Sequence, residues 1–97
     1  MRHGEITPIA GAWSDEENAW VSEPLMLRGD CWVEVTLADK GRMVIRKSEE
    51  ASGRYLLAMV TPWSGPSFRI RVYGSTQYRY IKIFLTDNPT KIEYANI

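Results

Sequence analysis

Apolar and polar residues alternate with a period of two along most of the chain, and clusters of Gly, Pro, Asn and Asp separate the alternating runs. This pattern is typical of β-strands with one buried face, because successive side chains of a strand point to opposite sides of the sheet. It predicts an all-β fold of about seven to eight short strands. We expect a small antiparallel β-sandwich, jelly-roll or immunoglobulin-like, or a barrel.

The segment 31–47, "CWVEVTLADKGRMVIRK", shows the alternation clearly. Its first inward positions are Cys31, Val33, Val35 and Leu37. A three-residue loop at 39–41, with glycine last, is a common closure of a β-hairpin. The segment therefore predicts a hairpin that pairs Leu37 with Met43 on the inner face.

Three other segments have predicted places in the fold. In "EITPIAGAW", Pro8 predicts an edge strand, because proline cannot donate to a hydrogen-bonded ladder. The spacing of Ser14 and Glu17 resembles a capping box, so we expect at most one short helical turn near residues 14–20. Residues 54–62, "RYLLAMVTP", are apolar on both faces and predict a central strand.

Residues 67–84, "SFRIRVYGSTQYRYIKIF", combine this alternation with basic and aromatic side chains. A loop of even length would place the apolar positions of both halves on one side, whereas an odd loop would bury charge. We therefore predict a hairpin whose inward residues are Phe68, Ile70, Val72, Ile81, Ile83 and Leu85. Its outer surface would be cationic and aromatic, with Arg71 beside Tyr80.

Three interpretations of this surface remain open. Arg stems and Tyr rings stabilise sheet surfaces without binding anything. The same residue types are the usual anchors of protein contacts, and aromatic rings also stack on sugars. Basic grooves with stacking aromatics bind single-stranded nucleic acid. We rank nucleic acid last, because the chain has no net charge and no motif of the RRM or cold-shock type.

The amino-acid composition restricts the class of protein but does not indicate a particular function. The 97 residues are 44% hydrophobic and 25% charged, ordinary values for a globular chain, and we expect one domain over 1–97. Residues 1–50 hold ten acidic and six basic residues, a net of −4, and residues 51–97 hold two and six, a net of +4. Such separation favours head-to-tail self-association into a homo-oligomer.

The residues needed for catalysis are scarce. Cys31 is the one cysteine and His3 the one histidine, so neither an intrachain disulfide nor a zinc cluster is predicted. The acidic group 15–17 lacks the spacing of a calcium loop. Arg28-Gly29-Asp30 most simply predicts a turn, although the tripeptide also occurs in adhesion motifs. We expect no enzyme activity, no cofactor and no metal.

The chain shows no signal peptide and no apolar run of the roughly 20 residues that a membrane helix needs. Its compartment is left open. The expected function is a non-catalytic module acting through protein or carbohydrate contact, as an accessory domain or as a subunit of an assembly such as a virion. The alternative is a single-stranded nucleic-acid-binding domain that uses hairpin 67–84. The candidate binding residues are Arg69, Arg71, Tyr73, Tyr78, Tyr80 and Lys82, with Trp32 and Trp63 as secondary choices.

Overall fold

A computed structural model describes residues 4–38, 41–63 and 66–97. Ten strands and no helix occur in these ranges. The strands are β1 (Ile6–Pro8), β2 (Gly11–Ser14), β3 (Ala19–Ser22), β4 (Leu25–Met26), β5 (Cys31–Thr36), β6 (Gly41–Ser48), β7 (Leu56–Trp63), β8 (Ser67–Val72), β9 (Tyr80–Leu85) and β10 (Lys91–Asn96). More strands form than the pattern predicts, because the first 26 residues contribute four short ones.

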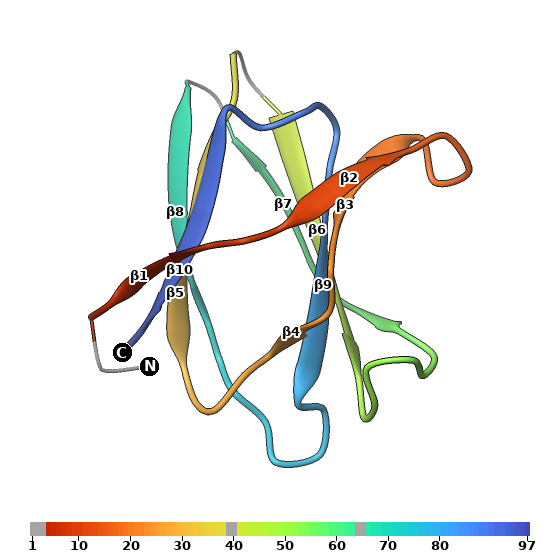
Figure 1. The fold of residues 1–97 in the computed structure, drawn as a ribbon, viewed down its shortest axis with the longest axis vertical. Coiled ribbons are helices and arrows are strands. Elements are labelled where there is room, and N and C mark those ends of the chain that lie inside the picture. The colour runs from red at the N-terminus through yellow and green to blue at the C-terminus, as the bar shows by residue number, and fades with distance from the viewer. Residues whose placement is uncertain (1–3, 39–40, 64–65) are drawn as a thin grey trace.

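The strands form two antiparallel sheets that face each other (Figure 1). Sheet A has four strands in the order β1-β10-β5-β8. Sheet B has six, in the order β2-β3-β9-β6-β7, with β4 also pairing β9. The chain passes from sheet A to sheet B between β1 and β2. The all-β fold and the antiparallel sandwich are confirmed.

The core lies between the two sheets and is built by the alternating positions. The four inward residues of the 31–37 run are fully or almost fully buried, as predicted. Sheet B contributes Trp20, Met43, Ile45, Ile81, Ile83 and Leu85 from its own inner face. Phe68 and Ile70 are partly buried and pack against the same cluster. Strands β5, β8 and β9 therefore turn toward the core the face that their sequences indicate.

The predicted hairpin over 67–84 is wrong. Strand β8 pairs with β5 in sheet A, whereas β9 pairs with β3, β4 and β6 in sheet B. The connection 73–79 crosses from one sheet to the other, and the Ser75 hydroxyl accepts hydrogen bonds from the backbone N–H groups of Gln77 and Tyr78 within it. Both strands keep their apolar faces inward, because the two sheets of a sandwich share one core.

The hairpin predicted for 31–47 is also wrong, for the same reason. Strand β5 lies between β10 and β8 in sheet A, and β6 lies between β9 and β7 in sheet B. Met43 consequently pairs with Leu85 and Thr61 rather than with Leu37. The predicted loop residues Asp39 and Lys40 lie outside the described part of the chain.

Of the two predictions about edge and central strands, one is confirmed and one is wrong. Pro8 lies in β1, an edge strand of sheet A, as predicted. Strand β7 is not central, because it forms the outer edge of sheet B and pairs with β6 alone. Its apolar residues on both faces are thus partly exposed, and Leu57 is 60% exposed.

A tight turn rather than a helical one joins β2 to β3. The Ser14 hydroxyl accepts a hydrogen bond from the Glu17 N–H, which is the capping contact that the spacing indicates. The chain then reverses instead of continuing as a helix, because Asn18 adopts a left-handed backbone with φ of 53°. The reversal allows Trp13 to pair with Trp20 across the hairpin.

Candidate functional site

The six residues predicted to form one surface lie on two opposite sides of the molecule. Arg69 and Arg71 face outward from sheet A, with Tyr73 just beyond β8. Tyr80 and Lys82 belong to β9 of sheet B, and Tyr78 precedes them. The predicted contact between Arg71 and Tyr80 is absent, since Arg71 lies 5.1 Å from the ring centre of Tyr73 instead. The candidate surface is therefore two separate faces.

The first of these, which we call the Trp32 face, is the outer side of sheet A. The strand register places four side chains in one row across the sheet: Ile6, Ala95, Trp32 and Arg71. The next row is Pro8, Glu93, Glu34 and Arg69. Ile6 is 63% exposed, the second most exposed large hydrophobic residue of the described chain after Tyr73. The face thus combines an aromatic ring, an exposed aliphatic residue and both signs of charge.

Trp32 and Arg69 form the centre of the Trp32 face. The Arg69 guanidinium carbon lies 4.5 Å from the centre of the Trp32 ring, a cation–π contact that fixes both side chains. The pair lines a groove of about 380 Å³ together with Ile6, Glu34 and Asn96, among others. Lys91 approaches the carboxylates of Glu34 and Glu93 at 3.7 and 3.4 Å, so these acids belong to an ion-pair cluster at the rim.

Asp30 connects the edge of the Trp32 face to the end of the sandwich. Its carboxylate accepts a hydrogen bond of 2.8 Å from Arg71 and another of 2.9 Å from the Gly74 N–H. The Arg71 bond is the main cause and the Gly74 bond the second cause of an Asp30 pKa below its ordinary value. The carboxylate of the Arg28-Gly29-Asp30 tripeptide is thus occupied within the chain, which favours the turn interpretation over adhesion.

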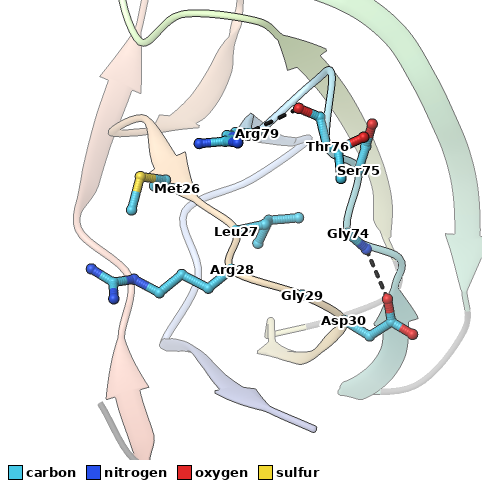
Figure 2. Close-up of a pocket in the computed structure, with 9 residues that line it drawn as sticks. All are labelled: Met26, Leu27, Arg28, Gly29, Asp30, Gly74, Ser75, Thr76 and Arg79. Atoms are coloured by element: carbon cyan, nitrogen blue, oxygen red, sulfur yellow. Dashed lines mark hydrogen bonds between the residues drawn. The ribbon is translucent and has the colours of Figure 1, made fainter.

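A cleft of about 440 Å³ lies beside this bond, between the segments 26–30 and 74–79. Figure 2 shows Asp30 turned toward Gly74 and the Arg28 side chain extending away from it. Arg79 lines the same cleft and donates from Nε to the carbonyl of Thr76 at 3.4 Å. The cleft was not predicted, because it depends on two loops that the sequence separates by more than 40 residues.

We predict that acid destabilises the fold partly through Asp30. Its native pKa is lowered, so the carboxylate stabilises the fold at pH values above its unfolded pKa of about 4. That contribution is lost as the pH falls through the lowered native pKa. In urea unfolding between about pH 2 and 7, Asp30→Asn should show a weaker loss of stability at the acid end than the wild type. Arg71→Gln should flatten the acid limb too. An unchanged acid limb in both variants would contradict this role.

The second face is the outer side of sheet B, and most of its aromatic contacts involve residues that the sequence did not single out. The Lys82 ammonium lies 4.7 Å from the ring centre of Tyr55, and burial raises the pKa of that phenol. Arg46 lies 5.2 Å from the Phe84 ring on this face. Lys47 pairs with the buried residue Ile81, so its contact with the Tyr78 ring at 4.7 Å does not belong to the outer face. The outward parity of Phe84 was a usable signal. Its partner Arg46 follows only from the pairing of β6 with β9.

The other three tryptophans differ in their surroundings. Trp20 is buried, and a Cβ at Gly11 would collide with its ring, so Gly11 provides the space for this side chain. Trp13 is exposed and donates from Nε1 to Asp15 at 3.2 Å. For Trp63 the backbone pairs with Gly41, and its side chain lies outside the described part of the structure.

The described chain contains the single cysteine and side chains of types that can bind a metal ion. Cys31 is completely buried, and this burial raises the pKa of its thiol to about 11, which keeps it protonated. Within residues 4–38, 41–63 and 66–97, no three His, Cys, Asp or Glu side chains gather as metal ligands. Over the same ranges, no helix has the length and apolar character to span a membrane.

Comparison with protein-family models, with curated proteins and with solved structures gives no match. Function is therefore inferred from the two outer faces of the sandwich themselves.

Proposed function

We propose that this chain is a non-catalytic β-sandwich module that binds a protein partner through the Trp32 face. The observation that carries the proposal is the stacked pair of Trp32 and Arg69 on the solvent side of sheet A. Trp and Arg are the residues in which binding energy most often concentrates at protein interfaces. Ile6 adds exposed apolar area beside them, and the ion pairs of Lys91 supply a polar rim.

Protein contact suits this face better than a sugar or a nucleic acid. The Arg69 guanidinium already covers one side of the Trp32 ring, which removes one of the two flat surfaces on which a sugar would stack. Glu34 and Glu93 lie in the same row as Arg69 and would repel a phosphate backbone. The nucleic-acid alternative also loses hairpin 67–84, on which it rested.

The test places a photo-crosslinking residue at position 6, on the Trp32 face, and in a second sample at position 26, an exposed site of sheet B. Both proteins are illuminated in an extract of the cells that produce the chain. We expect a crosslinked product of defined mass from position 6 and none of that mass from position 26. Arg69→Ala should weaken its formation at least about tenfold, as expected for an interface anchor.

A glycan array run in parallel tests the carbohydrate interpretation. If the chain binds a glycan on the array, and Arg69→Ala or Trp32→Ala changes that binding, the face would be assigned to a sugar and the protein proposal would be overturned. The protein proposal would also be overturned if no crosslinked product forms that depends both on the probe at position 6 and on Arg69. Because Trp32 is partly buried, the thermal unfolding of both variants is measured first, and the exposed Arg69 carries the comparison if Trp32→Ala unfolds.

A further inference from the structure

The strands at the two ends of each sheet order, β1, β8, β2 and β7, differ in how well they are protected against pairing with another chain. Strand β1 has three residues including Pro8, and β2 has four. Strand β8 carries Arg69 and Arg71. Short strands, proline and charge are the usual protections of an edge. Strand β7 spans eight residues, Leu56–Trp63, contains no charged residue, and has one proline, Pro62, next to its last residue.

The side chains of β7 are also unusually exposed for their type. Leu57 is 60% exposed, Val60 47% and Leu56 40%. Val60 ends an apolar row that runs across the outer side of sheet B through Val21, Phe84 and Val44. An apolar row that stops at an open sheet edge is an association surface.

The hydrogen bonds of the neighbouring strands show which backbone groups of β7 are open. Arg42 donates its N–H to the Thr86 hydroxyl, and its carbonyl accepts the Thr86 N–H, so both groups point toward the β9 side. Its partner Pro62 therefore occupies a non-hydrogen-bonded position against β6, so the ladder with β6 loses no bond and the missing N–H lies on the free edge. By alternation, the N–H and the carbonyl of Val60 point to the free edge.

We propose that two copies of this chain pair antiparallel along β7, about a two-fold axis at Val60. In this register the Val60 N–H of each copy donates to the Val60 carbonyl of the other. The apolar row then continues from one copy into the second. Pro62 falls opposite residue 58 of the second copy, which is the bulged position of β7 between the pairs Ile45–Met59 and Arg46–Leu57. Pro62 cannot donate to that residue, so the two bonds of the Val60 pair hold the centre of the contact and the ladder weakens toward both ends.

The charges near β7 permit a second copy as the occupant. On the outer side, Arg42 and Arg46 of β6 lie opposite Pro62 and Leu57, one strand away from the edge. Across the pair, the cations of the two copies are separated by three strand spacings, about 14 Å, which exceeds the screening length of about 8 Å at physiological salt. An uncharged edge and screened neighbours favour self-pairing, whereas a charged peptide would find no counter-ion on β7.

A contact through one strand per copy is smaller than a standard protein interface, so we expect a weak dimer with a dissociation constant between about 10 µM and 1 mM. Sedimentation equilibrium should show a mass that rises with concentration from 11.1 kDa toward twice that value. Val60→Lys should remain monomeric throughout, because it places a like charge on the axis. It should still fold, because Val60 is exposed on the outer side.

Two controls decide where any association occurs. Ile6→Lys introduces the same charge on the Trp32 face and should leave the dimer unchanged. Amide hydrogen exchange should show protection of Val60 that grows with concentration, while Thr61, which pairs with Met43, stays protected at every concentration. A monomer at about 1 mM, a dimer that Ile6→Lys abolishes, or a dimer that survives Val60→Lys would each overturn the proposal. None of these results bears on the crosslink from position 6.

Discussion

Replacing Ile83 by alanine is expected to lower the free energy of unfolding by about 2–5 kcal/mol. Ile83 is completely buried in β9, a strand that β3, β4 and β6 all pair with, so the lost methyl groups leave a cavity that the surroundings cannot fill. Its N–H also donates to the buried Ser22 hydroxyl at 2.8 Å, which ties the position to β3. Urea unfolding followed by fluorescence measures the change.

Ile6→Ala is the matched control for this measurement. It removes the same atoms from a side chain that is 63% exposed, so its effect should stay within about 0.5 kcal/mol. Equal losses for the two variants would mean that β9 is not a central strand of sheet B.

Gly74→Ala is expected to destabilise the chain by about 1–3 kcal/mol, the usual cost of forcing extra atoms into a packed site. A Cβ at position 74 would lie 2.7 Å from the carbonyl carbon of Gly29, and the other close atoms are also Gly29 backbone. The loops could relieve this contact only by separating, which would break the bond from the Gly74 N–H to Asp30. The melting temperature should fall by about 4–8 °C per kcal/mol.

Gly29→Ala provides the comparison within the same loop pair. A Cβ at position 29 would meet no heavy atom within 4 Å, so we expect an unchanged or slightly higher melting temperature. A loss as large as that of Gly74→Ala would show that the two segments do not meet as described.

The sequence predicted the strands and their inward faces well, because alternation is a local property of the chain. Cys31, Val33 and Val35 are all buried, as the pattern indicates. The pairing of the strands could not be predicted the same way. In a sandwich both sheets turn apolar faces to one core, so β8 and β9 show the same alternation in opposite sheets as they would in one hairpin.

The sequence predicts some residues of the candidate site, but it does not predict which of them contact one another. Trp32 and Arg69 were both selected, yet their contact depends on the pairing of β5 with β8. The bond between Asp30 and Arg71 joins residues 41 positions apart and has no local signal. Strand β7 is apolar on both sides, which predicts a central strand, but it lies at the end of sheet B because no strand of the described chain pairs with its second side.

The first and last strands of the chain lie side by side, since β1 pairs with β10 and the Gly4 N–H donates to the Asn96 carbonyl. During synthesis on the ribosome, sheet A therefore cannot close until residues 91–96 have left the exit tunnel, because β10 separates β1 from β5. Gly4 and Ile97 also line the groove of the Trp32 face. Any peptide joined beside Gly4 or Ile97, whether an affinity tag or the linker of a circular permutant, would thus crowd the groove of the Trp32 face.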